Sequence, residues 1–302
     1  MIEWFTDAFA SELTQRALLA GLLAAVTTAV VGTWVVIRGM TFFGDAVAHG
    51  VLPGIALAFV WGLDVTVGAL VSAAVMIAGI EVVHRRARLA EDTGIGLLFV
   101  GMLALGVIII SREDTYAGDL TSFLFGDILG VRTADLWLQA AITVATLLAG
   151  GLLYRPFLAL SFNPDKARAL GQRPALAHAA LLVLLALAVV GSFRVVGTLL
   201  VFGLLVAPPA AATLVVRTVP ATMAVAAVLG CLAVLLGLAL SYHADTAASA
   251  TVAGVAVAEF FLALAAREVA GLRHRRPRRA AQLGRTVPSA DEPTPTIVVS
   301  SS

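Results

Sequence analysis

An aspartate and a histidine stand four residues apart within an otherwise apolar stretch. Asp45 and His49 belong to the run GDAVAHGVLPG, and side chains at positions i and i+4 lie on the same face of an α-helix. A carboxylate and an imidazole on one face form half of a site for a borderline divalent cation such as Zn²⁺ or Mn²⁺. The alternative is an Asp–His hydrogen-bonded pair that only fixes helix packing, and the spacing alone leaves both interpretations open.

Small and helix-breaking residues surround this pair. They are Gly44, Gly50, Pro53 and Gly54. Glycine carries no side chain and proline removes a backbone donor, so such residues open space and free carbonyl oxygens beside a pathway. The sequence therefore predicts a thinned or broken helix around the candidate site.

Three further ionisable residues are candidate metal ligands. His243 and Asp245 follow Ser241 and Tyr242 at the end of a long apolar run, and Glu259 lies deep in the next run. Ionisable groups inside membrane segments are costly unless they are paired or hydrated, so each is a functional candidate by default. The alternative for the first cluster is ordinary polarity at the level of the lipid headgroups. For Glu259 the alternative is a polar contact with a neighbouring helix.

The elements that must position these side chains are membrane-spanning helices. Of the 302 residues, 60% are hydrophobic and 13% are charged, and the mean hydropathy is +0.98. A soluble domain normally carries about 25% charged residues, so lipid is expected to be the solvent for much of this chain. The predicted fold class is all-α, a polytopic transmembrane helical bundle.

About 20 mostly apolar residues are needed for a helix to cross the hydrocarbon core. Nine segments meet this criterion: 16–37, 42–61, 65–83, 94–111, 134–154, 175–192, 195–216, 221–241 and 246–266. Only Ser192, Phe193 and Arg194 separate the sixth segment from the seventh. The stretch 119–131 is too short and too acidic to span, and is expected to form a surface helix or a re-entrant segment.

Basic residues predict the orientation, because they are retained on the cytoplasmic side. With Arg38 inside and the spans alternating, sixteen of the 20 lysines and arginines lie inside. The N-terminus is then outside and the C-terminus is cytoplasmic. Residues 1–15 form a short extracytoplasmic segment without the basic region of a cleavable signal peptide, and residues 16–266 form the transmembrane domain.

Residues 267–302 change in composition and are predicted to be a disordered cytoplasmic tail. The tail begins with the basic run RHRRPRR and ends in a Pro/Ser/Thr-rich stretch. Its basic part either lies against anionic lipid headgroups or is simply solvated.

The longest internal cytoplasmic segment is 155–174. Asn163 can cap a short helix that begins at Pro164, and Gly171 can end it. This helix would either dock on another protein or serve as a solvated connector. The chain has no P-loop, no H-E-x-x-H and no G-x-S-x-G motif, and its single cysteine, Cys231, allows neither an intrachain disulfide nor a cysteine-based metal site.

In combination, four stretches resemble the ABC-3 family of metal-importer permeases, the membrane subunits of zinc and manganese uptake systems. They lie in family order at 16–59, 91–110, 165–174 and 195–216. With the less distinctive last spans, the resemblance covers nearly all of residues 16–266.

This resemblance implies a fold like the vitamin-B12-type importers, with two permease copies around a central pathway in the cytoplasmic (inner) membrane. It also implies two separate ATPase subunits that use the ATP, an extracytoplasmic metal-binding protein, and no role as an enzyme. No prosthetic group and no nucleic acid is expected. Asp45 and His49 match the family's G-D-x-x-x-H element, where a metal-coordinating gate is expected. The segment 163–174 matches the region that couples to the ATPase, and its residues of interest are Asn163, Asp165, Lys166, Arg168 and Gly171.

Zinc is the ion that the sequence favours, because GTWVVIRGM, DTGIGLLFVGMLALGV and LVFGLLVAPPAAA are most similar to zinc-type permeases. Manganese, or iron, is the alternative, since Asp/His sites serve several divalent metals. A permease for a siderophore or haem would need a wider, mostly apolar pathway. A secondary transporter would favour inverted repeats, which the sequence does not display, and a membrane scaffold or receptor would transport nothing.

Overall fold

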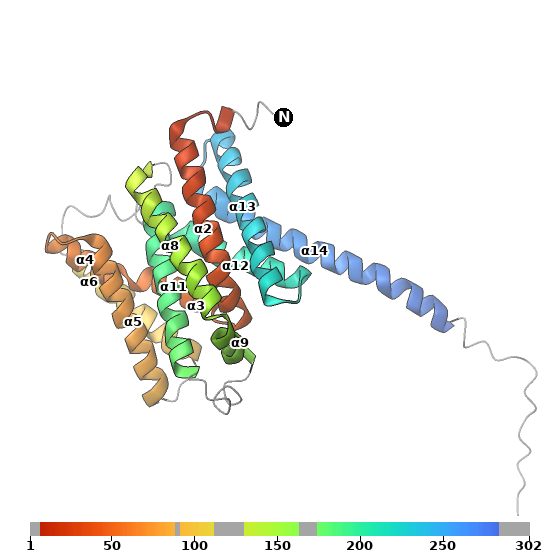
Figure 1. Ribbon diagram of the computed structural model, residues 1–302, viewed down its shortest axis with the longest axis horizontal. Coiled ribbons are helices and arrows are strands. Elements are labelled where there is room, and N and C mark those ends of the chain that lie inside the picture. Colours follow the sequence, from red (N-terminus) through yellow and green to blue (C-terminus); the bar gives the residue numbers. More distant parts are fainter. Residues whose placement is uncertain (1–6, 88–90, 112–129, 163–173, 284–302) are drawn as a thin grey trace, which may run out of the picture.

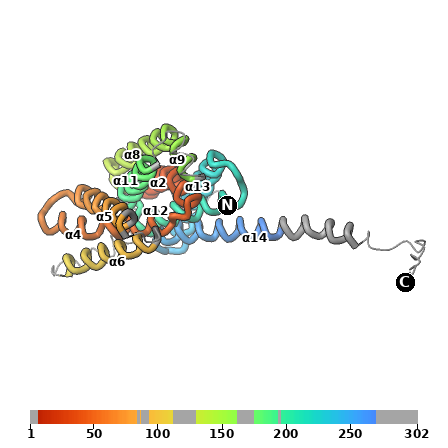
Figure 2. The backbone as a smooth tube through the Cα atoms, turned by 90° about the horizontal axis from the view of Figure 1, so that it is seen from below, coloured from red at the N-terminus to blue at the C-terminus, as the bar shows by residue number. Residues whose placement is uncertain are grey.

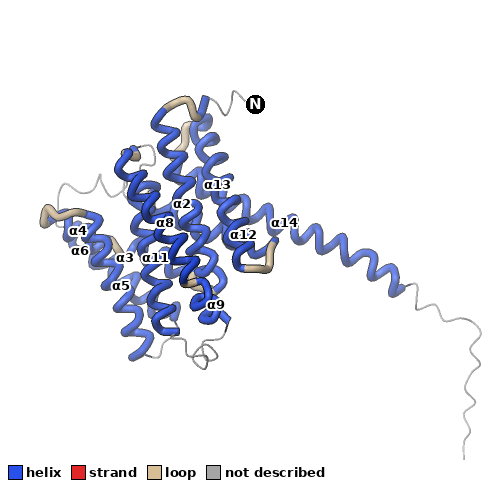
Figure 3. Tube along the Cα trace, viewed as in Figure 1, coloured by secondary structure: helices blue, strands red, loops and turns tan. Residues whose placement is uncertain are grey.

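The computed structural model describes residues 7–87, 91–111, 130–162 and 174–283, and within these ranges the regular elements are helices, with no strand (Figures 1 and 3). The helices are α2 (Glu12–Ile37), α3 (Thr41–Gly50), α4 (Leu52–Val60), α5 (Val65–Ala87), α6 (Glu91–Ile110), α8 (Thr133–Leu152), α9 (Tyr154–Phe162), α11 (Pro174–Val196), α12 (Thr198–Val215), α13 (Val219–Ala244) and α14 (Ala248–Leu283).

The prediction of about nine membrane spans is confirmed by the length and composition of these helices. Nine segments of the described chain are long and apolar enough to cross a bilayer. The second of them, Thr41–Val60, consists of α3 and α4 together. The last, Ala248–Val269, is the first part of the longer helix α14.

Helix α2 is the centre of the bundle. It packs against α8, α11, α12 and α13, and small residues let these neighbours approach closely. A Cβ on Gly32 would lie 2.1 Å from the carbonyl oxygen of Leu205 in α12. Leu205 lies four residues before Pro209, which has no N–H to donate to the Leu205 carbonyl within α12. Because Gly32 has no side chain, α2 can pack directly over this carbonyl oxygen.

Helices α4, α5 and α6 form a second group beside this centre (Figure 2). Helix α3 connects the two groups, because it contacts α6 on one side and α11 and α12 on the other. The candidate site on α3 therefore lies at the junction of the two groups.

Buried polar side chains tie α2, α8 and α11 together. The hydroxyls of Thr27 and Thr143 are 2.9 Å apart, and the amide nitrogen of Gln139 donates to the hydroxyl of Ser192 at 3.1 Å. All four side chains are buried. Hydrogen bonds between helices hold membrane bundles together where lipid removes the hydrophobic driving force between them.

An aromatic cluster closes the end of the bundle where α2 finishes. Trp34 is fully buried, and its ring centroid lies 5.7 Å from that of Tyr154 and 5.6 Å from that of Phe157. The two partners belong to α9, a short helix that extends from the end of the predicted fifth span into the predicted cytoplasmic segment 155–174. The packing of Tyr154 and Phe157 on Trp34 stabilises α9 against the bundle.

Three predicted boundaries are corrected by the structure. Helix α2 begins at Glu12, capped by Ser11, so the first span starts earlier than residue 16. Residues 192–194 do not separate the sixth and seventh spans, because α11 continues to Val196 and the chain turns at Gly197, whose φ is +86°. Helix α14 continues to Leu283, through residues predicted to begin the disordered tail. Residues 284–302 and 119–129 lie outside the described residues.

Helices α4 and α5 cross at a pair of glycines, and this crossing generates a stability prediction. A Cβ on Gly54 would lie 2.0 Å from the carbonyl oxygen of Gly68. We expect Gly54→Ala to destabilise the protein by about 1–3 kcal/mol through overpacking, and to lower its melting temperature in detergent. Gly101→Ala is the matched control, because a Cβ at this helical position has no neighbour within 4 Å. Equal melting temperatures for the two variants would contradict the close crossing.

Candidate functional site

The turn between α2 and α3 sets the direction of the site helix. Gly39 adopts a φ of +68°, which reverses the chain just after Arg38. The backbone N–H of Met40 returns to the carbonyl of Val35 at 2.9 Å, and its side chain is buried. Helix α3 then starts at Thr41, directly after this turn.

Asp45 and His49 lie on one face of α3, as their spacing predicts. Asp45 Oδ1 and His49 Nε2 are 3.5 Å apart, and the side chains are 29% and 27% exposed. This separation is too long for a strong hydrogen bond. Two ligand atoms that are each about 2.1 Å from a tetrahedral ion lie about 3.4 Å apart, so the pair has the spacing of two neighbouring metal ligands.

An aromatic ring from the second helix group borders this pair. The His49 ring packs edge-on against Phe99 of α6, with the centroids 5.8 Å apart, and Phe99 contacts Phe42 at 5.7 Å. On the other side, Gly44 lets Leu205 of α12 reach α3, since a Cβ there would lie 2.5 Å from Leu205 Cδ2. Helices from both groups therefore pack against α3 beside the pair.

The predicted break in the helix is present directly after His49. Helix α3 ends at Gly50, and α4 starts at Leu52. Pro53 cannot donate to the carbonyl of His49 four residues earlier, and the N–H of Val51 turns to that carbonyl instead. The break lies at membrane depth, where freed backbone groups need partners within the protein.

Helix α5 supplies the partner for this break. The buried hydroxyl of Ser72 donates to the carbonyl of Gly50 at 2.8 Å. Met76, also on α5, fills the space beside Gly50, where a Cβ would lie 2.0 Å from its sulfur. Sequence reasoning missed Ser72 and Met76. Ser72 could have been flagged as a hydroxyl within an apolar span, whereas the role of Met76 carries no sequence signal.

The remaining ligand candidates are not brought to this pair. His243 and Asp245 are exposed at the end of α13, where Asp245 caps the helix with a φ of +49°. Glu259 is half-buried in α14, with its Oε2 atom buried and lacking a hydrogen-bond partner. Among the described residues, no three His, Cys, Asp or Glu side chains are grouped as a metal site. The role of these three residues stays a prediction.

The predicted ATPase-coupling residues Asn163, Asp165, Lys166, Arg168 and Gly171 lie outside the described residues. The structure does describe where the following helix meets the site region. His178, near the start of α11, lies with Nδ1 3.4 Å from an Nη atom of Arg38. Arg38 directly precedes the turn into α3, so this contact links the start of α11 to the site helix.

Comparisons with known proteins show what the chain is similar to. A family model described as the ABC 3 transport family matches residues 10–267. The manganese import system permease protein ScaB of Streptococcus parasanguinis is 36% identical, over 87% of this chain and 93% of that protein. The chelated iron transport system membrane protein YfeD of Yersinia pestis is 33% identical, over 86% and 87% of the two chains.

A solved structure, PsaBC from Streptococcus pneumoniae in complex with Fab, is similar in fold and sequence. The match has a TM-score of 0.78 and 32% identity, and covers 87% of this chain and 95% of that one. Together with the helical bundle, this match confirms the predicted fold class of an ABC importer permease.

The Ser72 hydroxyl generates a prediction about the break beside the site. We expect Ser72→Ala to lose about 1 kcal/mol of stability, because it leaves the Gly50 carbonyl without this donor. Thermal unfolding in detergent should show a melting temperature about 2–4 °C lower. Ser111→Ala is the matched control, since the exposed Ser111 hydroxyl donates to the carbonyl of Ile108, three residues earlier, and not to another helix. An unchanged melting temperature for Ser72→Ala would show that the break does not depend on this bond.

Proposed function

Because the chain belongs to the ABC 3 transport family of metal importer permeases, we propose that it carries divalent metal ions through the cell membrane, driven by ATP hydrolysis in a partner subunit. The observation that carries this proposal is the Asp45–His49 pair, two metal-ligand types at ligand spacing beside a break in a membrane helix. Broken helices are where membrane transporters commonly bind their substrate ions.

One chain supplies only half of the coordination that a transition metal needs. Metal ions of this kind take at least four ligands, whereas Asp45 and His49 provide two. Both side chains remain partly exposed, so further ligands can approach from outside the chain. A second copy related by twofold symmetry would add the same two residues. We therefore expect one ion to bind between two permease chains.

The first ion to test is Mn²⁺, with Fe²⁺ next. The reported relatives carry names for manganese and for chelated iron, and neither name mentions zinc. The zinc preference inferred from the sequence stays a prediction, because carboxylate and imidazole ligands accept all three ions. Weak binding is expected of a transport site, since an ion that binds too tightly is not released.

The rest of the importer follows from the same family membership. Two separate ATPase subunits would dock on the cytoplasmic side near residues 163–174, and an extracytoplasmic metal-binding protein would deliver the ion. The N-terminus would lie outside and the C-terminus inside. Movement of α11 on ATP binding would reach the site through the contact between His178 and Arg38. Alternating access would then open α3 to one side of the membrane at a time.

Removing either ligand should abolish transport without unfolding the protein. The test uses proteoliposomes that contain the chain with its cognate ATPase and binding protein. We expect Asp45→Asn and His49→Ala each to lower ATP-dependent ⁵⁴Mn uptake at least tenfold, because each variant removes one of the two proposed metal ligands of the chain. Glu268→Gln is the control, a carboxylate neutralised at an exposed position of α14. Uptake that persists in His49→Ala, or needs no ATP, would contradict the proposed mechanism.

The number of ions bound tests the shared site directly. Equilibrium dialysis of the purified full chain against Mn²⁺, Fe²⁺ under anaerobic conditions, or Zn²⁺ should give one bound ion for every two chains. The stoichiometry should fall to near zero in Asp45→Asn. One bound ion for each chain would show that the site is completed within a single copy. Binding of Zn²⁺ but not of Mn²⁺ or Fe²⁺ would support the zinc preference inferred from the sequence.

A further inference from the structure

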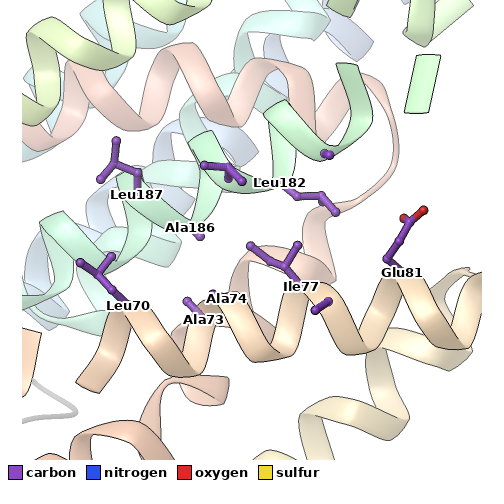
Figure 4. Close-up of a pocket in the computed structure, with 11 residues that line it drawn as sticks. Leu70, Ala73, Ala74, Ile77, Glu81, Leu182, Ala186 and Leu187 are labelled. Carbon is purple, nitrogen blue, oxygen red and sulfur yellow. The ribbon is translucent and has the colours of Figure 1, made fainter. Parts of the chain in front are cut away.

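An apolar groove lies between α5 and α11, away from the Asp45–His49 pair. Its volume is about 390 Å³, within the range of small-molecule sites. Figure 4 shows side chains from the two helices facing each other across it. The residues used below are Leu70, Ala74, Ala78 and Glu81 of α5 with Ala179 and Val183 of α11.

Small side chains create this groove. Ala74 and Ala78 stand one turn apart on α5, and Ala179 stands opposite on α11. These alanines are exposed, as is Val183. The groove is therefore open to the outside of the bundle, and in a membrane-spanning region the surrounding solvent is lipid.

The length of the groove matches one leaflet. From Leu70 to Glu81 the α5 backbone rises about 16 Å, and half of the hydrocarbon core is about 15 Å. Glu81 lies two residues before Val83, where the apolar span of α5 ends. The groove thus runs from the headgroup level toward the middle of the membrane, on the cytoplasmic side in the proposed topology.

The mouth of the groove carries a charge that acyl chains cannot match. Glu81 lines the groove at this end, near the headgroup level, where the ammonium groups of lipids lie. Its two oxygens together accept about four hydrogen bonds, so it can bind an ammonium alongside protein neighbours.

We propose that this groove is a binding site for a phospholipid with a primary ammonium headgroup, phosphatidylethanolamine. One acyl chain lies along the alanines, and the ammonium donates hydrogen bonds to Glu81. Phosphatidylcholine has the same phosphate and acyl chains, but its quaternary ammonium has no N–H to donate. The site is independent of the metal pair and binds lipid whether or not metal is transported.

Native mass spectrometry of the purified full chain tests this site. The chain would be titrated with palmitoyl-oleoyl phosphatidylethanolamine, and with phosphatidylcholine and phosphatidylglycerol of the same acyl chains. We expect one phosphatidylethanolamine to bind about tenfold more tightly than phosphatidylcholine, as a charge-assisted hydrogen bond allows. Glu81→Gln keeps the shape of the side chain and should remove this preference, while Ala78→Phe fills the groove and should remove the bound lipid.

Val71→Phe is the matched control, because it adds the same ring to an exposed position of α5 that does not line the groove. It should bind phosphatidylethanolamine like the wild type. Size-exclusion chromatography of each variant checks that the fold is retained. The proposal is overturned if the preference survives Ala78→Phe, or if phosphatidylglycerol binds best and Glu81→Gln has no effect. It is also overturned if Ala78→Phe changes the oligomeric state instead, since the groove would then hold a second copy of the chain.

Discussion

The structure depends on the rule that a backbone polar group inside a bilayer must find its partner within the protein. An uninterrupted helix satisfies this rule by itself, but the second span is broken between Gly50 and Leu52. The hydroxyl of Ser72 accommodates the break by donating to the Gly50 carbonyl. The candidate metal ligands stand immediately before it, so the position of the site and the integrity of the helix are set by the same contacts with α5.

Close packing around small residues gives these contacts their precision. Gly32, Gly44 and Gly54 each let a neighbouring helix approach to a distance that any side chain would prevent. In lipid, such approach replaces the hydrophobic driving force that holds helices together in water. Small residues have the opposite result between α5 and α11, where exposed alanines leave a groove, because no helix among the described residues fills the space.

Helix α3 places the candidate site between the two helix groups. The helix contacts α6 on one side and α11 and α12 on the other, and His49 packs against Phe99 of α6. A relative movement of the two helix groups would change the environment of Asp45 and His49 at once. The Arg38–His178 contact connects the start of α11 to the turn that leads into α3, which gives such movement a direct physical route.

The sequence alone determined the fold class, the nine spans and the Asp45–His49 pair, because hydrophobic length and the i, i+4 spacing are local properties. It also indicated the break, since Pro53 removes a helix donor wherever it stands. Only the tertiary structure decided which side chains pack and hydrogen-bond at the helix break and which border the candidate site. Ser72, Met76 and Phe99 reach α3 from separate helices, and contacts between segments distant in sequence depend on how helices pack, which no local pattern records. The helical path of residues 154–162 was missed for the same reason, because it rests on Trp34, more than a hundred residues away.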